Sequence, residues 1–193
     1  MTPNPGRQAG RPRSAEKREA ILAATLALLT AQGYVRTTLD QVAARAGVSK
    51  STVHLRWKTK ADLVSAALAA QRVGDHVAPL TGDARADLVT RLAAFATFLD
   101  DVRGMRLIGT CLAEEEHHPE LLALMRERTV GPRRALFREA LEQQPGLAAD
   151  PEDVVSALIG SYFADYYAGR TTGDRNAWAV RVVDLLLGGA LRR

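Results

Sequence analysis

The sequence predicts an all-α protein. Apolar residues recur at spacings of three and four, as on one face of a helix, and no segment shows the alternation of a half-buried strand. Alanine and leucine, both strong helix formers, dominate the composition, whereas aromatic residues make up only 5% of the chain. A chain of 193 residues, 47% of them hydrophobic, can bury a globular core in one domain or in a small domain fused to a larger one.

The amino terminus combines a tail with a first helix. Residues 1–13 are rich in proline, glycine and arginine and have no apolar period, so we expect a disordered basic tail. A first helix over about 15–32 follows, since Ser14 can cap its start and Gly33 can end it.

A second, short helix is expected directly afterwards. Thr38 and Gln41 have the spacing of a capping box, which predicts a helix over about 39–46. Gly47 then ends that helix, because glycine readily adopts the left-handed conformation of a turn.

Two further helix starts lie close behind. Ser49 can cap a third helix that runs to about Trp57, and Thr59 with Asp62 opens a fourth that continues through Leu68. Helices this short bury too little surface alone. We therefore expect them to share one compact core with the first helix.

Proline and glycine breaks divide the remaining chain into longer helices. Pro119 and Pro151 stand at first helical positions, with His118 and Asp150 as the candidate caps before them. The expected helices cover about 84–102, 104–116, 119–143, 151–168 and 174–191.

The positive charge of the chain is concentrated at one end. Residues 1–60 hold eleven Lys and Arg against three Asp and Glu, whereas the other residues hold fifteen against nineteen. A basic first third on a mildly acidic remainder predicts that this end meets a polyanion, and nucleic acid fits best.

The segment 39–57 has the pattern of a helix-turn-helix motif. Ala43 lies one turn before Gly47, and Val53 follows the turn, which suits two helices that cross closely. The second helix then displays short donors and cations, which suit base edges and phosphates: Lys50, Ser51, Thr52, His54 and Arg56. This pattern predicts DNA binding, and a plain helical hairpin is the alternative.

Several spaced motifs resemble the amino-terminal domain of the TetR family of bacterial transcriptional regulators. The resemblance covers about residues 15–65, and the motifs agree in order and separation. They are Gly33-Tyr34, Thr37-Thr38, the stretch Val42 to Ser49 and the stretch Lys58 to Leu63.

The resemblance implies an all-α homodimeric transcriptional regulator, a repressor released from a palindromic operator by a small hydrophobic effector. It divides the chain into the disordered tail 1–13, a helix-turn-helix DNA-binding domain at 14–60 and a helical regulatory and dimerisation body at 61–193, which begins with the linking helix. Because no catalytic constellation is evident in the residues, we expect neither enzymatic activity nor a cofactor.

The resemblance also implies which side chains meet DNA. By position, Lys50, Ser51 and Leu55 are candidates for base edges. The candidates for phosphate are Thr38, Thr52, Arg56 and Lys60.

Two positions depart from the family pattern. Trp57 replaces a usual phenylalanine and keeps an aromatic core anchor. His54 replaces a usual tyrosine with a smaller group that titrates near neutrality. His54 could contact phosphate, read a purine N7 or pack, and these alternatives stay open.

The segment Gly10-Arg11-Pro12-Arg13 resembles the core of an AT-hook. In such an arm, Arg11 and Arg13 would enter the minor groove. Short runs of this kind also occur by chance in disordered tails, so the sequence leaves the role open.

The last two expected helices offer wider apolar surfaces than one packed face requires. Paired across two subunits they would form a four-helix interface, which predicts a symmetric homodimer. The candidate interface residues are Val155, Leu158, Ile159, Tyr162, Trp178, Val182 and Leu186.

Apolar residues between about 84 and 168 could surround an effector pocket, although they could equally fill a core. No inward basic cluster is evident from the sequence, so we expect an uncharged or weakly polar, partly hydrophobic ligand. The candidate lining residues are Phe95, Phe98, Leu99, Met105, Ile108, Leu112, Met125, Phe137 and Tyr166.

Other functions find little support in the residues. No phosphate-binding loop or nucleophile motif occurs, and the run Glu114 to His118 is expected to be a solvated helix end rather than a metal site. Cys111 is the only cysteine and is expected in the core. No apolar run could span a membrane. We expect a cytoplasmic protein, with a small helical enzyme or an adaptor as the alternative classes.

Overall fold

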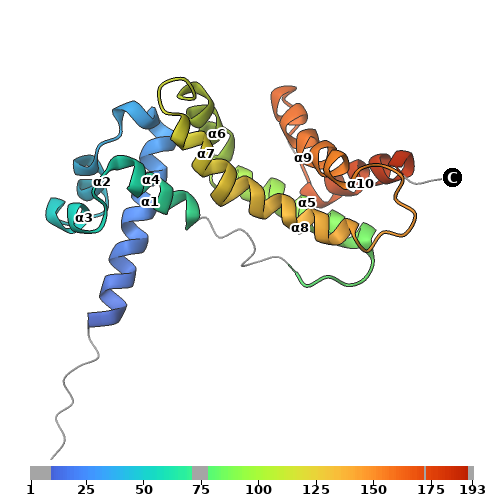
Figure 1. Cartoon of the computed structure of the whole chain (residues 1–193), viewed down its shortest axis with the longest axis horizontal. Helices are drawn as coiled ribbons and strands as arrows, with labels where there is room; N and C mark the ends of the chain where they lie inside the picture. The colour runs from blue at the N-terminus through green and yellow to red at the C-terminus, as the bar shows by residue number, and fades with distance from the viewer. Residues whose placement is uncertain (1–9, 71–77, 172, 191–193) are drawn as a thin grey trace, which may run out of the picture. The chain divides into compact units, whose positions relative to one another are not determined.

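The computed structural model describes residues 10–70, 78–171 and 173–190. Within these ranges the elements are all helices, which confirms the predicted fold class (Figure 1). The chain forms two compact units. We call Met1–Gln71 with Arg106–Thr129 the head, and Arg72–Met105 with Val130–Arg193 the body.

The first helix of the head is longer than expected. Helix α1 spans Gly10–Arg36, with a kink at Gly33, where φ is 81°. Residues 10–13 of the expected tail are therefore helical, and Ser14 lies inside the helix instead of capping it. Proline is tolerated in a first helical turn, because its missing N–H has no partner there anyway. Residues 1–9 of the expected tail lie outside the described residues.

The next three helices begin where their caps predicted. Helix α2 spans Leu39–Arg45 and α4 spans Lys60–Ala69, and both open with the complete capping boxes of Thr38 and Thr59. Helix α3 spans Lys50–Arg56, and the Ser49 side chain accepts from the Thr52 N–H. Side-chain caps thus set the positions of all three helices.

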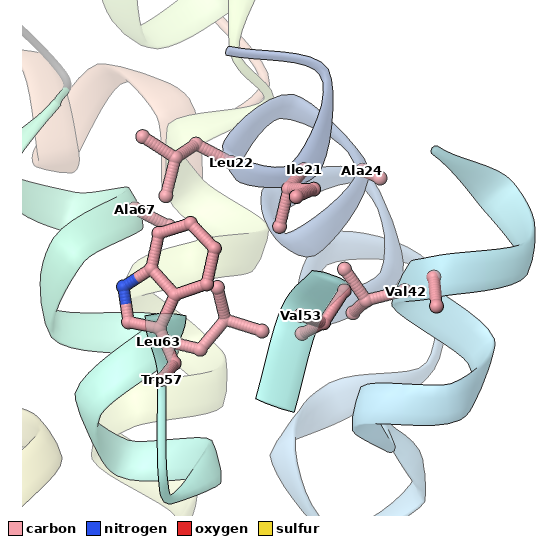
Figure 2. Close-up of a cluster of buried hydrophobic side chains, with 9 residues drawn as sticks. Ile21, Leu22, Ala24, Val42, Val53, Trp57, Leu63 and Ala67 are labelled. Atoms are coloured by element: carbon pink, nitrogen blue, oxygen red, sulfur yellow. The ribbon is translucent and has the colours of Figure 1, made fainter. Parts of the chain in front are cut away.

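A cluster of apolar side chains holds α1 to α4 together. It contains Val53 of α3 with no exposed surface, and Trp57, which is 8% exposed and follows α3 directly. Figure 2 draws nine of its residues and labels eight of them: Ile21, Leu22, Ala24, Val42, Val53, Trp57, Leu63 and Ala67. This core fixes α3 as a rigid support for its exposed side chains.

A second cluster extends the head beyond α4. Helix α6 spans Gly104–Ala113 and α7 spans Pro119–Met125, and α7 packs against α4. The cluster joins α1 and α4 to both: Leu29, Tyr34, Val64, Leu68, Leu107, Cys111, Leu121 and Met125. Cys111 is a buried core residue, as expected, and burial raises the pKa of its thiol to about 11.

The single helix expected over 119–143 is interrupted. A π-helical turn at Arg126–Val130 separates α7 from α8, which spans Gly131–Leu141. Pro132 stands at the start of α8. A proline lacks the N–H of the helical ladder, and its ring displaces the carbonyl four residues earlier, so a regular helix cannot continue through it.

The body is a packed group of helices. Helix α5 spans Ala84–Asp101, α9 spans Pro151–Tyr167 and α10 spans Arg175–Ala190. Helix α5 packs against α8, α9 and α10 (Figure 1). Asp150 caps α9 by accepting from the Glu152 N–H, as predicted, whereas His118 makes no side-chain cap on α7. None of the described helices is long and apolar enough to cross a membrane.

Candidate DNA interface and effector site

Helix α3 presents its polar and cationic side chains on the surface. Leu55 is 78% exposed, and Ser51 and Arg56 are also exposed, whereas Val53 points into the core. Ser51 and Leu55 lie four residues apart and therefore on the same face. Two of the three residues proposed for base edges thus share one exposed face of a short, capped helix, and Lys50 is exposed at its start.

One carboxylate holds two of the candidate DNA-binding side chains. Lys50 Nζ donates to Asp40 Oδ2 at 2.5 Å, and His54 Nε2 lies 3.7 Å from Asp40 Oδ1. The hydrogen bond from Lys50 is the main reason why the pKa of Asp40 is lowered. Asp40 belongs to α2, so this cluster links the two helices of the motif. No sequence pattern indicated this cluster, because Asp40 and Lys50 are ten residues apart.

Two hydroxyls proposed for phosphate contact have structural partners. The Thr38 side chain accepts from the Gln41 N–H in the capping box. Thr52 Oγ1 lies 2.8 Å from Ser49 Oγ, where either atom can donate. A hydroxyl has one donor and two acceptor positions, so both can still reach a phosphate oxygen. Their role at DNA stays a prediction.

Lys60 contacts Tyr34 near the end of α1. Its Nζ donates to the Tyr34 carbonyl at 2.8 Å and lies 4.0 Å from the centroid of the Tyr34 ring. Desolvation by burial lowers the pKa of Lys60. Arg56 similarly donates from Nη2 to Ser14 Oγ at 2.8 Å, although its side chain is exposed. Both cations therefore have intramolecular partners in addition to the phosphate role predicted for them.

The acidic and histidine-rich run, Glu114 to His118, follows α6 directly. His118 packs its ring edge against Tyr34, with centroids 4.7 Å apart, and its Nδ1 lies 3.1 Å from Glu120 Oε1. No group of three metal-ligating side chains occurs in the part of the chain that the structure describes.

Two family models match the chain. Residues 21–67 match "Bacterial regulatory proteins, tetR family", and residues 78–186 match "Tetracyclin repressor-like, C-terminal domain". This chain belongs to the TetR family of bacterial transcriptional regulators. The resemblance found in the sequence is thereby confirmed.

Individual relatives agree with the family models. A regulator of Mycobacterium bovis, named an uncharacterized HTH-type transcriptional regulator, is 36% identical over 77% of this chain and 71% of its own. A Mesorhizobium loti protein described as a TetR-family regulator has a TM-score of 0.72 at 21% identity, covering 93% of this chain and 99% of its own. FadR of Bacillus subtilis, solved in complex with stearoyl-CoA, has a TM-score of 0.71 at 18% identity, and the match covers 89% of this chain and 98% of FadR.

The effector residues predicted for this TetR-family body are divided between the two units. Ile108, Leu112 and Met125 belong to the head, where Leu112 is 51% exposed. In the body, the rings of Phe95 and Phe137 meet edge to face with centroids 6.3 Å apart. Leu99 is buried, Phe98 and Met105 are half-buried, and Tyr166 is 44% exposed. A pocket lined by these residues stays a prediction.

The expectation of no inward basic cluster is wrong. Arg91 of α5 is 6% exposed and Arg133 of α8 is 9% exposed, so both lie in the core of the body. The spacing in the sequence could have indicated this burial, because Arg91 lies four residues before Phe95 and Arg133 four residues before Phe137. Residues four apart lie on the same face of a helix. Both arginines were overlooked because a charged residue in a helix is usually solvated.

The contacts of Arg133 offset only part of its desolvation. Its guanidinium carbon lies 3.8 Å from the centroid of the Phe98 ring. Such a contact contributes about 2 kcal/mol when desolvated, whereas burying an ion costs on the order of several kcal/mol. Burial lowers the pKa of Arg133 to about 10, so the group still carries its charge at neutral pH.

The predicted dimer residues fall into two classes. Val155, Leu158, Tyr162 and Trp178 are buried inside the protomer, because α9 and α10 turn this face toward α5. These four belong to the core of the body. Ile159, Val182 and Leu186 keep exposed surface, together with Leu185, which is 77% exposed. An interface through α9 and α10 would therefore use this second class.

Proposed function

We propose that this TetR-family regulator is a homodimeric repressor that binds a palindromic operator through α3 and is released by a small-molecule effector in the body. The observation that carries the proposal is the exposure of Lys50, Ser51 and Leu55 on a capped helix that its neighbours hold rigidly. Rigid presentation of donors at this position suits reading of the major groove.

The basic surface of the head supports the same proposal. The cations of the first sixty residues give sequence-independent attraction to phosphates, which fixes the orientation of the head on the duplex. The repressor role is typical of the family. FadR, which was solved with stearoyl-CoA, illustrates that this fold accommodates a small molecule. The proposal assigns no catalytic step to the chain and places it in the cytoplasm, where bacterial DNA lies.

The experiment is selection of bound fragments from random DNA, followed by titration of the selected operator. We expect Lys50→Ala to weaken operator binding by roughly 1–3 kcal/mol and to relax the preference at one base pair. Arg126→Ala removes an exposed cation from the head outside the helix-turn-helix motif and serves as the charge-matched control. If operator affinity changes neither with salt concentration nor in the Lys50→Ala variant, the assignment of α3 as the DNA-reading helix is wrong.

The dimer has a separate test. Two heads on one operator should contact half-sites about 34–36 Å apart. Because Leu185 is largely exposed on α10, Leu185→Arg should raise the dimer dissociation constant without disturbing the protomer core. Sedimentation measures the mass, and a monomer at micromolar concentration in the unmodified protein would contradict this part of the proposal.

A further inference from the structure

Two buried guanidiniums lie along the seam where α5 packs against α8. Arg91 of α5 approaches Glu139 of α8, with Nη1 3.5 Å from Oε2. Arg133 of α8 stacks on Phe98 of α5. Each arginine therefore crosses to the opposite helix, and both belong to the same seam of the body.

The described residues pair these two cations only in part. Arg91 Nε and Nη1 are buried without a hydrogen-bond partner, and the side chain of Glu139 is itself 55% exposed. Arg133 makes no hydrogen bond or ion pair in the described part of the chain, and its one recorded cationic contact is the Phe98 ring. Arg91 thus has one long ion pair with a half-exposed carboxylate, and Arg133 has an aromatic contact but no anionic partner among the described residues.

A buried carboxylate on the same helix shows the contrast. Asp87 lies one turn before Arg91 and is equally buried, but Thr81 donates to it from both its N–H and its hydroxyl, at 2.9–3.1 Å. The described residues therefore give the buried anion three hydrogen bonds, whereas the two cations together have a single ion pair at 3.5 Å. This asymmetry leaves guanidinium donors at the seam for which an acceptor from outside the protein would be suited.

The side chains next to Arg91 and Arg133 indicate which other chemical groups a ligand at this seam would contain. Phe95 and Phe137 meet on the same seam, and they follow Arg91 and Arg133 by one helical turn each. A guanidinium offers a planar fork of donors that matches a carboxylate or a phosphate in two parallel hydrogen bonds. Aromatic side chains beside it suit an apolar group attached to that acid.

We propose that the α5–α8 seam binds an amphipathic anion, whose carboxylate or phosphate pairs with Arg133, whose apolar part packs on Phe95 and Phe137, and for which Arg91 is the second cation. The inference names the chemical class of the effector and so rests on the proposed function. It replaces the uncharged ligand expected from the sequence.

Calorimetric titration of the full-length protein with matched probes tests the inference. The probes are decanoate against 1-decanol and 2-naphthylacetate against 2-(2-naphthyl)ethanol, since each pair differs in the acid group, and decyl phosphate separates phosphate from carboxylate. We expect at least one acid to bind and its alcohol to bind at least tenfold more weakly. Arg133→Met should weaken binding of that acid roughly 10- to 100-fold.

Two variants control for charge and folding. Arg181→Met removes an exposed arginine of α10, so the net charge changes equally, and it should leave acid binding unchanged. Arg133→Met should keep or raise the melting temperature of the free protein, because it removes an unpaired buried charge while keeping side-chain length. If Arg133→Met does not fold, Arg133→Lys replaces it, which keeps the charge and loses the planar fork.

Several results would overturn the inference: no binding of any acid, equal binding of acid and alcohol, or unchanged acid binding in the Arg133 variant. Operator release by the bound acid is measured separately. If the acid binds through Arg133 but leaves DNA affinity unchanged, the anion site stands and the proposed effector coupling fails. If the protein binds no operator, the proposed function fails independently of the site.

Discussion

The head and the body distribute their charges in opposite ways. The cluster that holds the head together consists of apolar side chains, and the cations of α3 lie on its surface. The body buries Asp87, Arg91 and Arg133 among its apolar residues. The buried polar residues of the head, Thr25 and Thr37, instead donate their hydroxyls to the backbone carbonyls four residues earlier.

This difference indicates where each unit carries out its function. A surface that reads DNA needs exposed donors on a rigid support, and an apolar core supplies that rigidity at little cost. A buried unpaired charge lowers the free energy of unfolding. The buried arginines of the body therefore suggest a role other than stability. The interior of the head has only to hold its DNA-facing surface in place.

The largest expected effect comes from emptying the core of the head. Trp57→Ala removes a side chain that is 8% exposed and packs in the cluster of α1 to α4, which should cost about 3–5 kcal/mol of unfolding free energy. Operator binding should be lost with it, because α3 loses its support. Urea unfolding followed by circular dichroism checks the stability, and Trp57→Phe is the conservative control. Normal stability and operator affinity in Trp57→Ala would refute the rigid-support explanation.

The next effect compares two buried charges one turn apart on α5. Asp87→Ala removes the acceptor of the hydrogen bonds from Thr81 and should cost about 1.5–3 kcal/mol. Arg91→Met removes a charge whose Nε and Nη1 make no hydrogen bond among the described atoms and whose ion-pair partner, Glu139, is half exposed, so it should leave stability unchanged or raise it. Thermal unfolding of both variants measures the difference. Equal destabilisation would show that the body needs both charges for folding.

Helix caps should matter equally in the two units. Thr59→Ala in the head and Asp150→Ala in the body each remove a side-chain acceptor from the first turn of a helix. Each change should cost about 1 kcal/mol. Thr59→Ser and Asp150→Asn keep an acceptor and serve as controls in urea titrations. A cap that can be removed without cost in one unit would mean that tertiary packing alone positions that helix.

The smallest expected effect is a loss of body stability in acid. The pKa of Asp165 is lowered, mainly because Trp178 Nε1–H donates to it at 2.8 Å and also because Arg170 lies beside it. A carboxyl group with a lowered folded-state pKa adds stability above its unfolded pKa, and this contribution is lost as pH falls through the folded value. The loss should begin below about pH 4.

Urea unfolding at pH 6 and pH 3, followed by fluorescence of Trp178 in a Trp57→Phe background, measures this effect. Asp165→Asn should unfold more easily at pH 6 and depend less on pH than the parent. An equal loss of stability in both proteins would assign the acid sensitivity to other carboxylates, such as Glu152 and Asp184, whose pKa values are also lowered by arginine partners.

Sequence patterns predicted the head well and the body only in outline. The starts of α2, α3 and α4 followed from Thr38, Ser49 and Thr59, since a cap and its helix lie within four residues of each other. The π-helical turn within 119–143 was missed, although Pro132 was visible, because a proline does not by itself say whether a helix ends or continues beyond a wider turn.

The contacts of the candidate DNA-binding residues were also beyond the sequence. Lys60 was predicted to meet phosphate from its position, but its bond to the Tyr34 carbonyl joins residues 26 positions apart. Asp40 was not singled out, although it holds Lys50 and approaches His54. Pairings of this kind depend on how two helices cross, which residue spacing does not specify.

The sequence by itself determined that this protein is an all-α TetR-family regulator with a basic, capped helix-turn-helix, because those signals lie within a few residues of one another. Only the tertiary structure decided that Arg91 and Arg133 are buried, and that Val155 and Leu158 face the protomer's own core rather than a partner. Burial depends on which other helix covers a given face, and a helix with apolar residues on several faces does not specify that neighbour.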